Sequence, residues 1–252
     1  MGICLAIVNQ KGGVGKSTTA VNLGACLAES GKRVLLVDID PQGNATSGVG
    51  IDKRQLDGCM YDVLIDGRDI KEVILPTEVS GLEAAPATLE LAGAEIELVS
   101  AMSREYRLKG SLDGVKGSYD YILIDAPPSL GLLTINALSA ANAALVPIQC
   151  EYYALEGVSQ LVSTVSLVKE HLNPNLEIAG VLMTMYDART NLSQQVVEEV
   201  RRFFGEKVFD TIIPRNVRLS EAPSHGQPII LYDPQCRGAQ AYRDLAREVM
   251  GA

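Results

Sequence analysis

Short apolar runs alternate with amphipathic stretches along most of the chain. Seven apolar runs predict strands over 3–8, 33–38, 81–86, 120–125, 143–148, 177–184 and 207–213. Several are apolar almost throughout, which is typical of parallel strands covered on both faces. The stretches between them predict helices over 17–30, 88–109, 154–172 and 239–250. This alternation predicts an α/β fold with a mostly parallel, doubly wound twisted sheet flanked by helices.

The stretch between the second and third predicted strands, 41–80, has a weaker pattern and is richer in Gly and Asp. We expect it to form a loop-rich excursion over the edge of the sheet. The helix predicted over 88–109 rests on apolar positions at Leu89, Leu91, Ile96, Leu98 and Met102. The chain contains no Ser/Gly-rich linker, repeat or low-complexity run, so we expect one domain over residues 1–252.

Composition narrows the class of protein. The 252 residues are 47% hydrophobic, which is enough for a large buried core and excludes global disorder. A net charge of −9 argues against a histone-like or polybasic nucleic-acid binder. Five scattered cysteines and two histidines, without a CxxC pair, argue against a zinc or disulfide framework. The N-terminus has neither a signal peptide nor a membrane span, and a reducing cytoplasm fits.

A glycine-rich loop follows the first predicted strand and precedes a helix. It reads Lys11-Gly12-Gly13-Val14-Gly15-Lys16-Ser17-Thr18. Three glycines let backbone N–H groups turn inward around phosphate oxygens, and the helix start adds its positive dipole end. Lys16 supplies a charge to the β- and γ-phosphates, and the Ser17 hydroxyl suits Mg²⁺. The strand–loop–helix context therefore predicts a nucleotide phosphate loop.

This loop departs from the plain GxxxxGK[ST] pattern. Gln10 stands where the first glycine belongs, and a second lysine, Lys11, stands five residues before Lys16. Two lysines in one loop repel each other unless anionic charge lies between or beside them. Lys11 is therefore predicted to serve phosphate too, and a dimer interface is one place where it could do so.

Carboxylates end two predicted strands. Asp38 and Asp40 lie at i and i+2, on the same face of an extended chain. Asp125 ends the run Ile122-Leu123-Ile124, which is a Walker B pattern. Carboxyl ends of strands are where α/β proteins bind ligands. Aspartates there can orient attacking water and organise Mg²⁺.

These motifs together resemble the ParA/MinD superfamily of deviant Walker A ATPases, and most closely its Soj-type chromosomal ParA members. The resemblance implies an ATP sandwich homodimer in which Lys11 reaches the partner's nucleotide and the two loops meet at Gly12. It implies three catalytic residues: Asp40, which activates water, and Lys11 and Lys16, which act on the phosphates. The stretch from Asp38 to Asn44 resembles the family's first switch segment, and the stretch from Asp125 to Ser129 resembles its second. Asp38 would support the metal or the first switch segment, while Ser17 and Asp125 serve Mg²⁺.

The resemblance extends over almost the whole chain. The segment from Gln149 to Gly157, QCEYYALEG, resembles the family's dimer face and places Glu151 there. Pro214 and Asn216 match residues that contact adenine. Arg189 and Arg218 match arginines that bind DNA without sequence preference.

The charge distribution bears on the DNA interpretation. Residues 1–184 hold 13 basic and 22 acidic side chains, whereas residues 185–252 hold 9 of each. The whole acidic excess therefore lies in the first three quarters. Since an acidic monomer should bind DNA poorly, we expect ATP to assemble two half-patches into one DNA-binding surface.

Two other classes of protein also combine a phosphate loop with catalytic aspartates. A MinD-like membrane-cycling ATPase needs a basic amphipathic tail. The C-terminal helix balances its charges, and its stripe of Tyr242, Leu245, Ala246 and Val249 should pack on the core. A metabolic P-loop enzyme is the third class. Its iron-protein form needs cluster-bridging cysteines, and none of the five cysteines lies just after Asp125.

We therefore expect an ATPase that uses ATP and Mg²⁺, dimerises with ATP and binds double-stranded DNA non-specifically. The resemblance implies a ParB-like centromere-binding partner that stimulates hydrolysis and a role in chromosome or plasmid segregation. It implies a cytoplasmic, nucleoid-associated protein without stable membrane association. Because the loop begins near the start of the chain, we expect no N-terminal DNA-reading extension and no operator repression.

Overall fold

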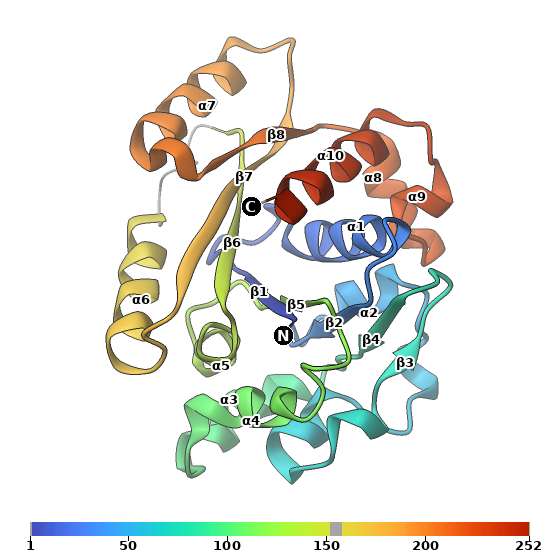
Figure 1. Ribbon diagram of the computed structural model, residues 1–252, viewed down its shortest axis with the longest axis vertical. Helices are drawn as coiled ribbons and strands as arrows, with labels where there is room; N and C mark the ends of the chain where they lie inside the picture. Colours follow the sequence, from blue (N-terminus) through green and yellow to red (C-terminus); the bar gives the residue numbers. More distant parts are fainter. Residues whose placement is uncertain (1, 152–157, 252) are drawn as a thin grey trace.

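The computed structural model describes residues 2–151 and 158–251, which form one eight-stranded sheet between two layers of helices (Figure 1). The strand order is β3-β4-β2-β5-β1-β6-β7-β8. The strands are β1 (Ile3–Ile7), β2 (Val34–Asp38), β3 (Leu75–Pro76), β4 (Leu82–Ala85), β5 (Tyr121–Asp125), β6 (Ala143–Gln149), β7 (Glu177–Tyr186) and β8 (Val208–Pro214). All neighbours pair in parallel except β3 and β4. The predicted fold class is confirmed.

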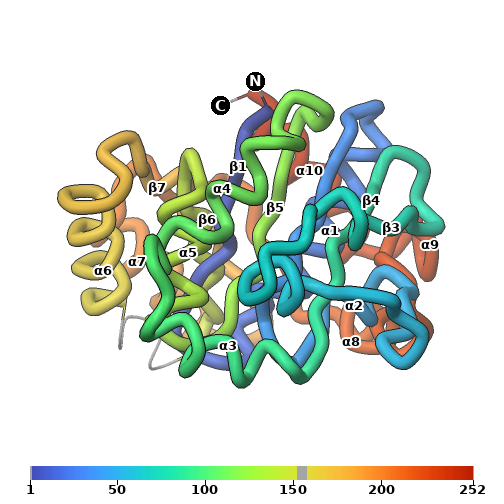
Figure 2. Tube along the Cα trace, turned by 90° about the horizontal axis from the view of Figure 1, so that it is seen from below, coloured from blue at the N-terminus to red at the C-terminus, as the bar shows by residue number. Residues whose placement is uncertain are grey.

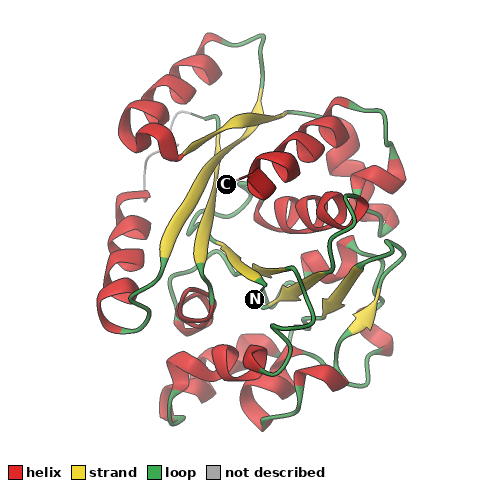
Figure 3. Ribbon diagram, in the orientation of Figure 1, coloured by secondary structure: helices red, strands yellow, loops and turns green. Residues whose placement is uncertain are grey.

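Helices cover both faces of the sheet (Figure 3). One face packs against α1 (Lys16–Glu29), α8 (Val217–Glu221), α9 (Ile229–Tyr232) and α10 (Arg237–Gly251). The other packs against α3 (Leu91–Glu97), α4 (Arg107–Asp113), α5 (Leu132–Ala140), α6 (Val158–His171) and α7 (Asn191–Phe204). Side chains of β1 alternate between the two cores, with Leu5 and Ile7 in one and Cys4 and Ala6 in the other. Burial on both faces explains why the strands are apolar throughout.

The seven predicted strands are all present, each within two residues of its predicted ends. The helices predicted over 17–30 and 239–250 are α1 and α10. The helix predicted over 154–172 is α6 from Val158 onward, and residues 154–157 lie outside the described residues. The predicted C-terminal stripe is confirmed as core, because Tyr242 and Leu245 are fully buried against α1 and β8.

The single helix predicted over 88–109 is wrong. This stretch forms α3, short turns at Leu98–Ser100 and Arg104–Tyr106, and then the start of α4. Ser103 adopts a left-handed backbone, with φ at 51°, which ends any continuous helix there. Leu91 and Leu98 are buried, but Ile96 and Met102 are exposed, so the apolar positions do not form one stripe.

The loop-rich excursion predicted over 41–80 is confirmed. It contains the short helix α2 (Asn44–Gly48), single helical turns η1 (Lys53–Gln55), η2 (Asp62–Asp66) and η3 (Ile70–Glu72), and the edge strand β3. Figure 2 shows the chain's N-terminus toward one end of the strands and α3 and α8 toward the other end. β1, β2 and β5 have their carboxyl ends side by side at the end near α3 and α8. There, Asp125 pairs in register with both Ile7 and Asp38.

Candidate nucleotide site

The phosphate loop connects β1 to α1 and needs glycine at two positions. Gly13 and Gly15 adopt left-handed backbones, with φ of 74° and 91°. Side chains are disfavoured in that region, whereas glycine adopts it freely. Gly15 is the N-cap residue of α1. Among the described residues, no side chain caps the N–H groups of the first turn. Those groups are therefore available to bind an anion.

Neighbouring strands anchor the loop through side chains. Asn9 donates from Nδ2 to the Pro147 carbonyl of β6 at 2.7 Å, and its Oδ1 accepts the Lys11 amide at 2.9 Å. The Thr184 hydroxyl of β7 donates to the Val14 carbonyl at 2.8 Å. These bonds hold the loop in shape from two strands far away in the sequence.

The two lysines of the loop have different environments. Lys16 is only 6% exposed, and its Nζ donates to the Lys11 carbonyl at 3.2 Å, across the loop. Burial lowers the pKa of Lys16, while the nearby charges of Asp125 and Asp40 raise it. Lys11 is partly exposed and does not line the cavity that Lys16 lines.

A cavity of about 570 Å³ lies over the loop. It is lined by loop and switch residues, including Gly12, Gly13, Gly15, Lys16, Ser17, Thr18, Asp40 and Pro128. An adjoining cavity of about 370 Å³ shares Gly15, Thr18, Met185 and Pro223 with it, so the two are continuous. The pair has room for the phosphates and the base of one nucleotide.

Pro214 and Asn216, predicted to contact adenine, both line the smaller cavity. Asn216 caps α8, because its Oδ1 accepts the Arg218 amide at 2.8 Å. That bond orients the side chain, and its Nδ2 can donate to a base. Met185 lies in both linings and has a left-handed backbone with φ at 54°.

Three buried carboxylates surround the loop. Asp38, Asp40 and Asp125 are 1%, 5% and 0% exposed. Both oxygens of Asp38 are used within the switch segment. Its Oδ2 accepts the Thr46 amide at 2.8 Å and the Thr46 hydroxyl at 2.7 Å, and its Oδ1 accepts the Asp40 amide at 3.1 Å. Of the two roles that the resemblance offers for Asp38, these bonds fit support of the switch.

Asp125 is the carboxylate that fits a metal. Both of its oxygens are buried and have no hydrogen-bond partner among the described residues. Burial and the charge of Asp38 raise its pKa well above the ordinary value. Within residues 2–151 and 158–251, no group of three His, Cys, Asp or Glu side chains could hold a metal. Mg²⁺ would therefore take Asp125 and Ser17 together with phosphate oxygens and water, which are ligands that it prefers.

The remaining predicted residues lie at the surface. Glu151 is exposed at the end of β6, where Gln149 donates to it at 2.6 Å, and the rest of its motif lies outside the described residues. Arg189 forms a two-bond ion pair with Asp187, at 2.9 and 2.6 Å. Arg218 pairs with Glu221 at 2.9 Å. Both arginines are thus engaged with carboxylates of their own chain.

A model of the AAA domain family matches residues 2–178. Over 99% of its length, the chain is 66% identical to the sporulation initiation inhibitor protein Soj of Bacillus subtilis, covering 98% of that protein. The chain belongs to the Soj-type branch of the ParA/MinD superfamily. It is also 55% identical to the chromosome-partitioning ATPase Soj of Treponema pallidum, over 99% of this chain and 98% of that one.

A solved structure has the same fold and holds a nucleotide. A cobyrinic acid a,c-diamide synthase from Mycobacterium smegmatis, solved with a bound ATP analogue and magnesium, is 39% identical. The two chains superpose with a TM-score of 0.88 over 99% of this chain and 95% of the other. This Soj-type chain is an ATPase, and its cofactors are ATP and Mg²⁺.

Sequence patterns missed four residues that shape the site. Asn9 and Thr184 anchor the loop, Thr46 holds Asp38, and Met185 lines both cavities. Asn9 lies two residues before Lys11, where the loop begins, so its position was a usable signal. The other three are brought in by the fold from α2 and the carboxyl end of β7, and no local spacing marks them.

Proposed function

We propose that this Soj-type ATPase is a DNA-binding switch. Two ATP-bound copies form a sandwich dimer, the dimer binds double-stranded DNA without sequence preference, and hydrolysis releases it. The observation that carries the dimer is the unequal placement of the loop lysines. Lys16 lines the chain's own nucleotide cavity, whereas Lys11 is partly exposed outside it and is free to reach a second nucleotide.

Gly12 supports the same dimer. A Cβ built on Gly12 would have Pro128 Cβ, at 4.0 Å, as its nearest heavy atom among the described residues. Its backbone is also outside the left-handed region. The single chain therefore gives no steric reason for a glycine here, whereas a partner loop packed against it would.

Asp40 is proposed to position the water for hydrolysis. It lines the phosphate cavity, and its Oδ1 accepts the Gln42 amide at 2.9 Å. One oxygen is thus fixed, and the other can orient a water toward the γ-phosphate. Asp125 and Ser129, which begin and end the Asp-Ala-Pro-Pro-Ser segment, both carry buried oxygens without partners among the described residues. Such groups can change partners when the γ-phosphate leaves.

Arg189 and Arg218 are proposed to contact DNA phosphates. Arg189 follows β7 and Arg218 follows the adjacent β8. Arg215 also lies close enough to lower the pKa of Asp187, the partner of Arg189. Exposed ion pairs contribute little to the free energy of folding, so DNA phosphates can replace Asp187 and Glu221 as partners of the two arginines. Each copy of the dimer would supply one set.

A role in chromosome or plasmid segregation completes the proposal. The chromosome-partitioning relatives support a role in segregation. We further propose that a ParB-like centromere-binding protein stimulates hydrolysis and that the nucleoid is the site of action. The MinD-like alternative would need a tail available to lipid, but Tyr242, Leu245 and Ala246 of α10 are buried in the core. Across the described ranges, none of the helices has the length and apolar character needed to span a bilayer.

Replacing Asp40 tests the proposal. Asp40→Ala should still bind ATP and dimerise, but should hydrolyse ATP at least about a hundredfold more slowly, because water loses its orienting carboxylate. We expect its ATP dimers to persist on random-sequence DNA in a sedimentation assay. Asp57→Ala, at an exposed position of the same excursion, is the control. Monomers in ATP, or wild-type hydrolysis, would contradict the role of Asp40.

A further inference from the structure

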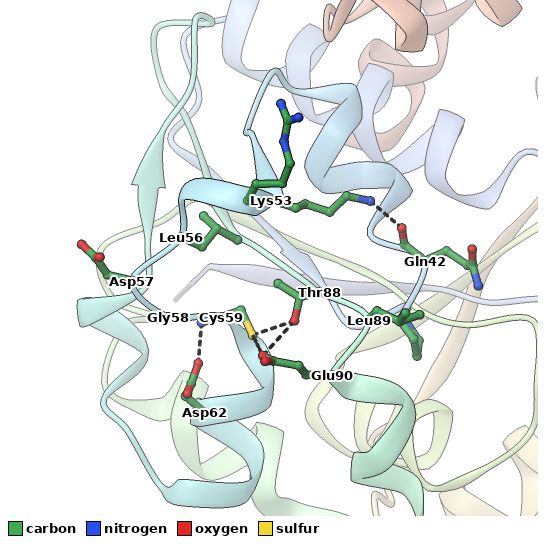
Figure 4. Close-up of a pocket in the computed structure, with 12 residues that line it drawn as sticks. Gln42, Lys53, Leu56, Asp57, Gly58, Cys59, Asp62, Thr88, Leu89 and Glu90 are labelled. Carbon is green, nitrogen blue, oxygen red and sulfur yellow. Dashed lines mark hydrogen bonds between the residues drawn. The ribbon is translucent and has the colours of Figure 1, made fainter.

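Lys53 lies outside the predicted motifs, on the helical turn η1, yet its ammonium reaches the switch segment. Its Nζ donates to the Gln42 carbonyl at 2.8 Å, a bond drawn in Figure 4, and to the Gly43 carbonyl at 3.3 Å. The side chain is half-buried and lines a cavity of about 670 Å³ beside the segment. Two adjacent carbonyls of the switch are thus held by one cation.

Gln42 connects Lys53 to Asp40. The amide of Gln42 donates to Asp40 Oδ1 at 2.9 Å, while its carbonyl accepts from Lys53. Residue 42 is therefore bonded on both sides, to the carboxylate proposed to orient water and to a lysine eleven residues later. A hydrogen bond from a charged donor is stronger than a neutral one, so Lys53 is a firm attachment for this peptide.

Gly43 shows how closely the stem of Lys53 packs on the switch. A Cβ built on Gly43 would lie 2.7 Å from Lys53 Cδ and 2.8 Å from the Ala87 carbonyl oxygen. The backbone at Gly43 is also left-handed, with φ at 59°. Gly43 therefore lies between the lysine stem on one side and the chain after β4 on the other.

The opposite end of the segment has its own attachment. Thr46 bonds Asp38 through its amide and hydroxyl, and the Thr46 hydroxyl accepts the Ala87 amide at 2.9 Å. That anchor fixes the Asp38 end of the switch to the sheet. The Asp40 end is held from outside the segment by Lys53 through Gln42.

We propose that Lys53 is a positioning residue for ATP hydrolysis, because it fixes the carbonyl of Gln42, and the N–H of the same residue, in the preceding peptide group, orients the Asp40 carboxylate. The proposal rests on the proposed role of Asp40. Without the ammonium, the Gln42 carbonyl loses its Lys53 donor, while the Gly43 amide of the same peptide group still donates to the Asp40 carbonyl at 2.8 Å. The backbone at Gln42, and with it the direction of the Asp40 carboxylate, is then held less firmly. Lys53 does not touch the nucleotide cavity, so its loss should reduce turnover and leave ATP binding unchanged.

Steady-state ATPase measurements test the proposal. Lys53→Met keeps the apolar stem and removes the donor, and we expect kcat to fall about tenfold with KM within about twofold. Lys53→Arg restores a cationic donor and should recover most of kcat. Lys71→Met, at an exposed lysine of η3, is the matched control and should resemble wild type. Wild-type kcat in Lys53→Met, a loss confined to KM, or a thermal midpoint that falls with kcat would overturn the proposal.

The double variant separates this proposal from the role of Asp40. If Lys53 acts through Asp40, Lys53→Met should cause no further loss in an Asp40→Ala background. A further loss there would mean that Lys53 acts by another route, and would overturn the proposal. Wild-type hydrolysis by Asp40→Ala alone would instead remove the proposed role of Asp40. An inactive Asp40→Ala beside an unaffected Lys53→Met would remove only the proposal for Lys53.

Discussion

Asp38 illustrates how a buried carboxylate is held at this site. Burial raises its pKa from 3.8 to about 6, and the bonds from Thr46 and Asp40 oppose that rise. Asp125, beside it in register, has no such bonds among the described residues. Two carboxylates this close and this buried favour a cation between or beside them, because neither is fully compensated by the protein. Mg²⁺ bound at Asp125 would supply that charge.

The pKa of Asp38 makes a prediction about stability. The pKa of Asp38 is higher in the folded protein than in the unfolded chain, so its protonated carboxyl favours the folded state. That contribution to stability is complete below about pH 4 and is lost as the pH rises through about 6. Without Mg²⁺ and nucleotide, the unfolding free energy of Asp38→Asn relative to wild type should therefore increase as the pH rises across this range, because only wild type must ionise a buried carboxylate. Urea unfolding of both proteins across this range measures it. A difference that stays constant with pH would contradict the raised pKa.

The phosphate loop, as an element, uses its glycines for different reasons. Gly13 and Gly15 need glycine because of their left-handed backbones. Gly12 has neither that backbone nor a close neighbour within the described chain. Its requirement for a small residue must come from outside the chain if it exists, and the proposed dimer supplies such a reason.

A side chain at Gly12 tests this distinction. Gly12→Val should keep ATP binding and the thermal midpoint of wild type, since the chain has space for it. It should lose ATP-dependent dimerisation, because the two loops could no longer approach. Analytical ultracentrifugation with and without ATP measures this, with Gly117→Val, at an exposed turn before β5, as the control. A Gly12→Val protein that still dimerises with ATP would place the interface elsewhere.

Charge acts at the scale of the whole molecule. The net charge of −9 resides in residues 1–184, and residues 185–252 are neutral overall. Arg189 forms an ion pair with Asp187, and Arg218 forms one with Glu221, within the same chain. At these two positions, a single copy therefore offers DNA arginines whose charge is already paired. Two copies side by side would double the number of arginines that can exchange carboxylate for phosphate.

Charge reversal tests whether location or total charge controls DNA binding. Arg189→Glu with Arg218→Glu should keep ATP-driven dimerisation and lose binding to random-sequence duplex. Milder Ala replacements should lower the salt slope of log affinity by about 3 to 4 units for the four arginines of a dimer. Arg201→Glu with Arg202→Glu, on exposed α7 positions, makes the same change in net charge and is the control. Equal loss in both pairs would show that net charge alone decides.

The sequence by itself determined every described strand except the short β3, the phosphate loop and the identity of the three aspartates. These are local features, because a strand covered on both faces must be apolar and a phosphate loop needs its glycines and lysine in consecutive order. It failed at 88–109, where the reversal at Ser103 depends on packing against neighbouring elements. It also missed α5 and α7, although α7 carries a capping Thr190 and a buried stripe of Val196, Val197 and Val200.

Only the tertiary structure decided how those residues work together. Thr184, Thr46 and Lys53 reach the loop and the switch from 170, 8 and 11 residues away. Such contacts follow from strand order and from the path of the excursion, since parallel sheets bring distant strand ends to one edge. The same order joins Asp125 to Asp38 in register and leaves its oxygens without protein partners among the described residues. Sequence spacing therefore predicts the chemistry, and the fold determines which groups hold it in place.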